Sequence, residues 1–253
     1  MNAIDDLPKL ILVLVVGFVA GFMNSLAGGG SLLTLPLLIF LGIPAPVANG
    51  TNRVALLFQN IVAVWKYAKG GVRHFRAGLL LAIPALVAAS VGASIAVGIS
   101  DEVLRRIIGV VLIVVGSFVL LSPDRWIKGS KKAPGRKPWL LGIAFILVGF
   151  YGGFIQAGIG FFILATLVVW GGYDLVHANA IKVLVILVYT VPALIIFARN
   201  GQVDWVTGLI LSVGNMSGAW LGTHLGLSKG AGWIRSVLLV AILIAAARLI
   251  FAP

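Results

Sequence analysis

The chain has 253 residues, of which 60% are hydrophobic and only 10% are charged, and its formal net charge is +12. Soluble domains carry about 25% charged residues, so this composition excludes a globular domain in water and predicts an all-α polytopic membrane protein. The absence of cysteine excludes disulfides, thiol chemistry and thiolate metal sites.

Apolar segments follow one another along the chain, and a spanning helix needs about 20 apolar residues. Single spans are predicted at 46–68, 77–99, 103–121, 176–198, 205–227 and 233–251. Two other segments, 8–41 and 138–171, are longer than one span and shorter than two, and glycines interrupt both. We predict that each forms a pair of shortened helices folded back on each other, with one long tilted span as the alternative.

A polar segment, S-P-D-R-W-I-K-G-S-K-K-A-P-G-R-K-P, separates the two series of spans. It contains six basic residues and one acid: Arg125, Lys128, Lys131, Lys132, Arg136, Lys137 and Asp124. The basic excess predicts a cytoplasmic loop that contacts anionic lipid, and no motif supports nucleic-acid binding. The predicted organisation is therefore a first membrane repeat (1–121), a basic linker (122–138) and a second membrane repeat (139–253).

The two halves resemble each other in sequence. V-G-F-V-A-G-F (16–22) matches V-G-F-Y-G-G-F (148–154), and Asn24 then falls opposite Gln156. After a two-residue slip, V-A-N (47–49) matches H-A-N (177–179). Repeats of this kind build secondary transporters, whose sites lie at the membrane midplane between the repeats. We favour an inverted second repeat, although the charges of the loops do not decide the orientation.

Two charged residues lie well inside the predicted spans, away from their ends, and both are cations. All seven acids lie at span ends or in loops, which argues against a carboxylate proton relay and against an enzyme that uses paired carboxylates. Arg53 and Lys182 lie about two turns inside their helices at similar depths in the two halves. Such cations either extend to the membrane surface or bind an anion that supplies the missing negative charge.

The glycine-rich interruption predicts where that anion would bind. Broken helices expose backbone N–H groups and a positive dipole end. Further donors near the breaks are Asn24, Ser25, Ser31, Gln156, Gly158 and Gly160. Tight helix packing is the alternative role for the glycines. Asn49 and Asn179 occupy the same place in each half, either satisfying backbone groups or contacting the ligand. No pattern indicates catalytic residues, a metal site or a cofactor.

These motifs resemble one known family. G-F-x-A-G-x-x-N-S-L-A-G-G-G-S-L-L-T-L-P-L-L, then G-I-P-x-x-x-A-N-G-T-N-R, and in the second half G-F-Y-G-G-F-I-Q-A-G-I-G-F-F and A-N-A-I-K, are similar to the TauE/SafE sulfite-exporter family. The resemblance implies a plasma-membrane permease for small anions, usually sulfite, sulfonates or thiosulfate. The matched positions are Asn24, Gly28, Gly29, Gly30, Asn49, Thr51, Asn52, Arg53, Gln156, Gly158, Gly160, Asn179 and Lys182.

The sequence thus predicts a multi-pass carrier, with export as the favoured direction. Arg53 and Lys182 are the expected anchors for the anion. An anion channel and a permease for small organic carboxylates stay open as alternatives. The oligomeric state is also open, with a homodimer among the alternatives.

Overall fold

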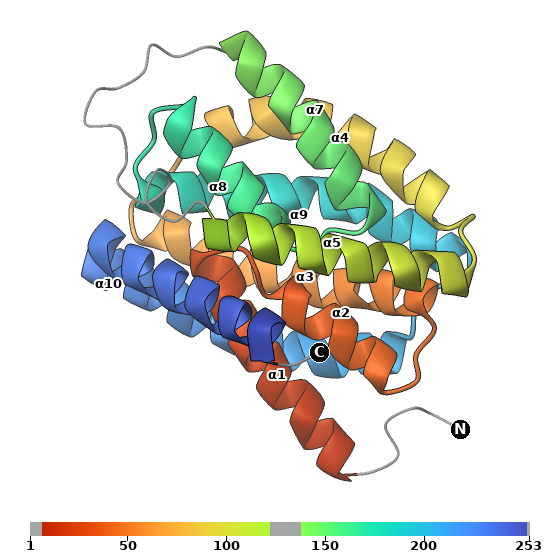
Figure 1. The fold of residues 1–253 in the computed structure, drawn as a ribbon. Coiled ribbons are helices and arrows are strands. Elements are labelled where there is room, and N and C mark those ends of the chain that lie inside the picture. Colours follow the sequence, from red (N-terminus) through yellow and green to blue (C-terminus); the bar gives the residue numbers. More distant parts are fainter. Residues whose placement is uncertain (1–6, 122–137, 252–253) are drawn as a thin grey trace.

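The computed structural model describes residues 7–121 and 138–251, which form a helical bundle without a strand in these ranges (Figure 1). The helices are α1 (Leu7–Leu26), α2 (Ser31–Phe40), α3 (Ala45–Lys69), α4 (Phe75–Ala96), α5 (Asp101–Leu121), α7 (Pro138–Phe154), α8 (Ile159–Val169), α9 (Leu175–Arg199) and α10 (Trp205–Phe251). Residues 122–137, which form most of the predicted basic linker, lie outside the described residues.

Length and composition identify membrane spans among the described helices. Three helices are long and apolar enough to cross a membrane, namely α1, α4 and α9. Three more, α2, α7 and α8, are apolar but shorter. Helix α3 has 25 residues, and its buried positions include Asn49, Asn52, Arg53, Gln59 and Asn60. A membrane helix with so many buried polar groups points to a functional interior.

The two interrupted segments are each broken by four residues, 27–30 and 155–158. The alternative of one long tilted span is therefore wrong for both segments. The prediction of two shortened helices is also wrong for α1, because 20 residues precede the first break and suffice to span a bilayer. The shorter helices are α2 with 10 residues, α8 with 11 and α7 with 17.

Corresponding helices of the two halves have matching bounds. Helices α3 and α9 both contain 25 residues, and both ends are displaced by 130 positions (175 − 45 and 199 − 69). Positive φ angles recur with the same spacing at Gly28 and Gly158, and at Gly71 and Gly201. The predicted spans 205–227 and 233–251 lie on either side of Gly230, whose non-helical backbone (φ 72) separates two helices within α10.

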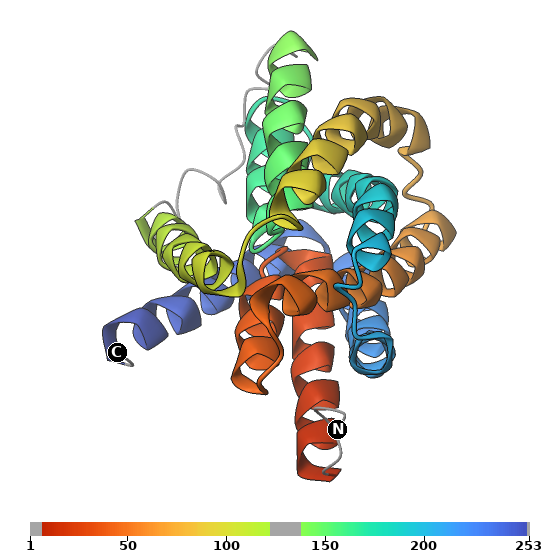
Figure 2. The ribbon, with the colours of Figure 1, turned by 90° about the vertical axis from the view of Figure 1, so that its right-hand side faces the viewer.

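The halves are interleaved in the bundle. Helix α1 packs along α10, and α7 packs along α4, so the first helix of each half pairs with a helix of the other half. Helices α3 and α9 contact each other and also pack on α10 and α4, respectively. Helix α5 lies at the edge of the bundle (Figure 2), where Val110, Ile113 and Val114 are exposed. The polar faces of α3 and α9 are thereby enclosed.

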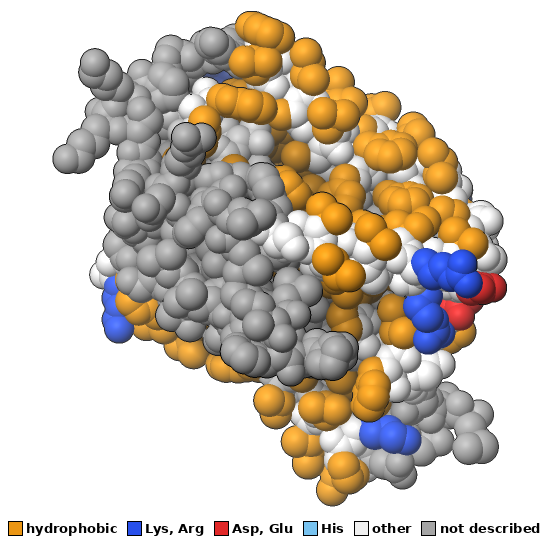
Figure 3. All heavy atoms as spheres, in the orientation of Figure 1, with side chains coloured by type: hydrophobic (Ala, Val, Ile, Leu, Met, Phe, Trp, Pro, Cys, Tyr) orange, Lys and Arg blue, Asp and Glu red, His pale blue; other side chains and the backbone are white. Residues whose placement is uncertain are grey.

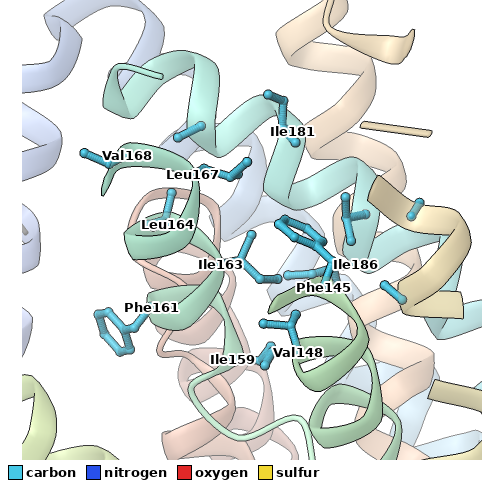
Figure 4. Packing of buried hydrophobic residues seen from close by; sticks show 14 of the residues in the cluster. Phe145, Val148, Ile159, Phe161, Ile163, Leu164, Leu167, Val168, Ile181 and Ile186 are labelled. Atoms are coloured by element: carbon cyan, nitrogen blue, oxygen red, sulfur yellow. The ribbon is translucent and has the colours of Figure 1, made fainter. Parts of the chain in front are cut away.

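Apolar side chains fill the second half and cover the outer surface. Phe145 of α7, Ile163 of α8 and Ile186 of α9 meet in the largest buried cluster (Figure 4). The face in Figure 3 is mostly hydrophobic where residues are described, as expected for contact with lipid. One group of charged side chains on this face lies where α5 begins, the region of the Arg105–Asp101 and Arg106–Glu102 ion pairs.

Candidate functional site

The two intramembrane cations are fully enclosed by protein. The side chains of Arg53 on α3 and Lys182 on α9 both have 0% exposure. The alternative that they extend to the membrane surface is therefore wrong. Within the described parts of the chain, neither cation forms an ion pair with a carboxylate. Both charges are instead held by neutral oxygen atoms.

Arg53 contacts the C-terminal end of α7. Its Nη1 donates to the carbonyl oxygen of Gly152 at 3.0 Å, and its Nη2 donates to that of Gly153 at 2.5 Å. The guanidinium carbon lies 4.7 Å from the centre of the Phe197 ring. Beside it, Asn49 Nδ2 donates to the carbonyl oxygen of Phe154, the last residue of α7, at 2.7 Å. An arginine and an asparagine of α3 thus cover the end of a helix in the other half.

Lys182 makes the corresponding contacts at the C-terminal end of α1. Its Nζ donates to the carbonyl oxygen of Asn24 at 2.7 Å and to Asn179 Oδ1 at 2.5 Å. Asn179 Nδ2 donates in turn to the carbonyl oxygen of Leu26, the last residue of α1, at 3.0 Å. Here a lysine and an asparagine of α9 cover a helix end in the first half.

These reciprocal contacts, which we call the cross-capping contacts, explain why the cations are tolerated. The last four carbonyl groups of a helix have no partner within the helix, and they carry about half a negative charge. Buried Asn, Lys and Arg donors satisfy them where the chain is broken inside the membrane. Asn49 and Asn179 therefore satisfy backbone groups, but of a helix in the other half. Because a helix end carries only about half a negative charge, it neutralises only part of the positive charge of Arg53 or Lys182.

Asn24 connects Lys182 to the start of α2. Its carbonyl oxygen accepts from Lys182, and its Oδ1 accepts from the backbone N–H of Gly30 at 2.7 Å. Its Nδ2 donates to Gln59 Oε1 of α3 at 3.0 Å. One side chain thus joins both arms of the broken hairpin to the long helix beside it.

Gln156 has the corresponding place in the second half. Its Oε1 accepts from Arg53 Nη1 at 3.1 Å, while its Nε2 donates to Tyr189 Oη at 3.3 Å and Thr190 Oγ1 at 3.4 Å. It is the one non-glycine residue with positive φ (68°) among the described residues. Such backbone conformations cost about 1–3 kcal/mol and concentrate at functional sites.

The two breaks touch at the centre of the molecule. A Cβ atom added at Gly28, whose φ is +90°, would overlap the Cα of Gly160, and one added at Gly160 would overlap the Cα of Gly28. Only glycine permits this approach of two backbones. Gly29 lies against the ring of Phe161, and Gly158 lies against Val115. The glycines therefore close the space between the two hairpins.

The start of α2 is tied to α3 by a second polar group. Asn52 Oδ1 accepts a hydrogen bond from Thr34 Oγ1 at 2.7 Å, and Asn52 Nδ2 donates one to Ser31 Oγ at 3.4 Å. All three residues are buried. Asn52 and Arg53 thus face different hairpins from neighbouring positions on α3.

Two of the predicted site residues make hydrogen bonds that do not involve the cations. Thr51 Oγ1 accepts from the backbone N–H of Asp204, just before α10, at 2.9 Å. Ser25 Oγ donates to the carbonyl oxygen of Phe22 within its own helix. The prediction also missed Gln59 and Tyr189, which contact Asn24 and Gln156, respectively. The 130-residue spacing of the halves (189 − 59) aligns these two positions and could have identified both.

The site retains hydrogen-bond donors without acceptors. Arg53 Nε is buried and has no partner. Lys182 has three donors, and two of them are used by the contacts above. No group of three or more His, Asp or Glu residues that could hold a metal occurs in the described ranges. A site rich in donors and poor in acids is suited to an anion.

The chain is similar to several known membrane proteins. The chain is 30% identical over 246 residues to a probable membrane transporter protein, ORF9, of Sinorhizobium, covering 96% of this chain and 93% of the relative. It is 31% identical over 245 residues to the probable membrane transporter protein YfcA of Escherichia coli K12, covering 96% and 91%. A probable membrane transporter protein of Methanocaldococcus jannaschii, MJ0441, is 28% identical over 222 residues, covering 84% and 80%.

No solved structure matches the chain at a significant level. The model of the sulfite exporter TauE/SafE family matches residues 13–249, which is nearly the whole chain. Together with the apolar spans α1, α4 and α9, this match shows a multi-pass integral membrane protein that takes part in membrane transport. The chain therefore belongs to the TauE/SafE sulfite exporter family.

Proposed function

We propose that this protein is a secondary transporter of the plasma membrane that exports small sulfur-containing anions such as sulfite, sulfonates or thiosulfate. One observation carries the proposal: two enclosed cations, Arg53 and Lys182, have only neutral partners among the described residues. An enclosed charge without a counter-charge is costly. A compact oxyanion would provide the counter-charge and accept several hydrogen bonds at once.

We further propose that the anion replaces the cross-capping partners. When the halves separate, Arg53 and Lys182 would exchange carbonyl oxygens for the oxygens of the anion. Charge-assisted hydrogen bonds to an anionic oxygen are about twice as strong as neutral ones. Asn24, Asn49, Gln156 and Asn179 would contribute neutral donors. The other proposed contacts are Ser25, Gly28, Gly29, Gly30, Ser31, Thr51, Asn52, Gly158 and Gly160.

The proposed architecture is a pair of inverted repeats, 1–121 and 139–253, joined by the basic linker 122–138. The equivalent helices α3 and α9 run in opposite directions, which supports this architecture. Gly50, near the start of α3, lies against Phe197 near the end of α9 and against Gln202 just after it. Inverted repeats allow alternating access by rocking one repeat against the other around a central site.

Electrostatics favour export by such a carrier. A membrane potential that is negative inside favours the export of one negative charge by about 2.3 kcal/mol per 100 mV. A carrier could therefore export an anion without a coupling ion. Its partners would be the anion and the bilayer, with anionic lipid at the basic linker.

The test is uptake of labelled sulfite, thiosulfate, sulfoacetate and a control carboxylate by proteoliposomes. We expect saturable uptake of a sulfur-containing anion, and we expect Arg53→Ala and Lys182→Ala to abolish it. Arg199→Ala, an exposed cation at the end of α9, is the matched control and should keep normal uptake.

Three outcomes contradict parts of this proposal. Normal uptake by both folded cation variants would refute the site. Selective uptake of the carboxylate would show that the substrate is an organic carboxylate and not a sulfur-containing anion. Ohmic currents without saturation would make the protein a channel.

A further inference from the structure

Three side chains on α3 and α10 carry buried oxygen atoms without a hydrogen-bond partner. They are Asn60 Oδ1, Asn215 Oδ1 and Thr223 Oγ1, and each residue has 0% exposure. An unsatisfied buried polar atom costs about 1–3 kcal/mol and requires an explanation such as a water molecule or an ion. We call these residues the unpaired polar stripe.

The stripe begins at the site already described. Asn215 Nδ2 of α10 donates to Gln59 Oε1 of α3 at 3.3 Å, and the same Gln59 oxygen accepts from Asn24 Nδ2 at 3.0 Å. Asn24 in turn holds Lys182 through its carbonyl oxygen. The stripe is therefore connected to one of the two cations by two side chains, without any apolar residue between them.

The stripe extends towards one end of the bundle. Thr223 follows Asn215 by eight residues on α10, which corresponds to about 12 Å along a helix. Trp220, on the same stretch of α10, has Lys66 Nζ of α3 at 4.5 Å from its ring centre. Beyond it, Leu227 lies against Gly70, directly after the end of α3. Lys66 and Lys69 make this end basic, which assigns it to the cytoplasm.

The two stripe residues on α10 have apolar counterparts on α4, in the first half. With the 130-residue spacing of the halves, Asn215 corresponds to Ala85 and Thr223 corresponds to Ala93 (215 − 85 and 223 − 93), and both alanines are buried. The same helix positions therefore pack well without polar groups. Polar side chains at Asn215 and Thr223 are not a requirement of the fold, so their cost points to a role in function.

The helices α1 and α10 beside the stripe pack with their backbones in direct contact. Gly214 and Gly218 of α10 lie directly against the backbone of α1, and Gly21 of α1 lies against the backbone of Asn215. Interfaces built from glycine have few interlocking side chains. Small sliding movements of packed helices are a common way to open and close such interfaces.

We propose that Asn60, Asn215 and Thr223 line a water-filled path from the cytoplasm to the anion site, between α1, α3 and the first part of α10. This inference rests on the proposed transport function and adds three pathway residues to it. When the path opens, water satisfies the three oxygen atoms and hydrates the entering anion. Lys66 and Lys69 concentrate anions at its entrance.

Cysteine accessibility tests the path directly, because the natural chain contains no cysteine. Single variants Thr223→Cys, Asn215→Cys and Asn60→Cys would be reacted with a membrane-impermeant thiosulfonate in sealed vesicles of both orientations. Ala93→Cys and Ala85→Cys, on α4 in the first half, are the matched controls for the two α10 positions. The Thr223→Cys change is nearly isosteric, so this variant is expected to fold if the larger changes do not.

We expect cytoplasmic reagent to label Thr223→Cys and Asn215→Cys about tenfold faster than the two controls, a factor that corresponds to about 1.4 kcal/mol. Reagent on the opposite side should label them slowly. Equal rates for stripe and control positions in folded protein, or faster labelling from the opposite side, would overturn the path. Labelling needs no knowledge of the substrate, so uptake without labelling refutes only the path, and labelling without anion uptake refutes only the proposed function.

Discussion

Each intramembrane cation is matched to a particular set of acceptors. Arg53 uses Nη1 and Nη2 to reach the carbonyl oxygens of Gly152 and Gly153 and the side chain of Gln156. A planar guanidinium can serve several acceptors in different directions, whereas an ammonium group is a compact point charge. Charge alone is therefore not sufficient at this position.

We accordingly predict that Arg53→Lys impairs the protein although it conserves the charge. Losing one or two charge-assisted hydrogen bonds should lower the free energy of unfolding by about 2 kcal/mol. Initial uptake rates should fall by about tenfold or more. Denaturant unfolding in detergent and uptake by proteoliposomes measure the two effects. Wild-type values in both assays would show that only the charge matters.

Gly28 provides a second prediction at the scale of one residue. In Gly28→Ala the new Cβ would overlap Gly160, and its φ of +90° is unfavourable for alanine. Strain and overpacking together should destabilise the protein by about 2–4 kcal/mol, measured by thermal or denaturant unfolding.

Gly42→Ala is the matched control, because Gly42 has φ +88° and no atom within 4 Å of an added Cβ. It should show only the cost of strain, about 1 kcal/mol. Equal losses in both variants would mean that contact between the two breaks contributes nothing to stability.

The sequence could identify the two cations and two of their partners, Gln156 and Asn179, but not the others. Arg53 and Lys182 are conspicuous because no acid lies at their depth. Their remaining acceptors are backbone oxygens at 152, 153 and 24, which every residue type possesses. Contacts to a backbone in the other half leave no trace in residue type, so only the three-dimensional approach of α3 and α7 reveals them.

At the scale of helices, the start of α3 is held by the start of α5. The backbone N–H of Ala45 donates to Asp101 Oδ1 at 2.5 Å. This hydrogen bond lowers the pKa of Asp101 below its ordinary value of 3.8, against the opposing effect of burial and with a further lowering by Arg105. The carboxylate thus caps α3 from a neighbouring element at the membrane surface.

The pH dependence follows from the direction of that shift. A carboxyl group with a lowered pKa in the folded state stabilises it at neutral pH, and this contribution is lost progressively below about pH 5. We therefore predict that Asp101→Asn is less stable than the wild type at neutral pH, and that the difference shrinks as acid protonates Asp101. Denaturant unfolding at several pH values measures it.

Glu102→Gln is the control for this prediction. Glu102 pairs with Arg106 on an exposed surface, where ion pairs contribute little. The Glu102→Gln variant should therefore have the same free energy of unfolding as the wild type across this pH range. A constant difference between Asp101→Asn and wild type at all pH values would contradict the role of the charged carboxylate.

Helix positions were largely predictable from hydropathy. The predicted spans 46–68 and 176–198 agree with α3 and α9 to within one residue at each end. The predicted spans 205–227 and 233–251 are the two helical parts of α10, which the non-helical backbone of Gly230 separates. The polar and glycine-containing residues 228–232 mark this division in the sequence, so it was predictable as well.

At the scale of the whole molecule, the cross-capping contacts make each half depend on the other. Helix ends at Leu26 and Phe154 are satisfied by Asn179 and Asn49, respectively. Unsatisfied backbone groups in lipid cost several kcal/mol each. We predict that fragments 1–121 and 139–253 are unstable when expressed singly and are recovered as a complex when expressed together.

Affinity purification of one tagged fragment, followed by detection of the other, measures this dependence. Expression of each fragment alone is the control. A single fragment that accumulates in the membrane and resists protease would contradict the predicted dependence. The sequence could suggest two units but not their interleaving, because pairing of α1 with α10 and α4 with α7 depends on surfaces that only meet after both halves have inserted.

The reciprocity of the cross-capping contacts has a consequence for the permeability of the membrane. Because every contact of Arg53 and Lys182 described above except that of Lys182 with Asn179 reaches a residue of the opposite half, both ammonium and guanidinium groups would be stranded in a low-dielectric interior if the halves parted without cargo. An idle carrier should therefore remain sealed against protons and chloride. Cells that overproduce the protein should therefore keep their normal membrane potential.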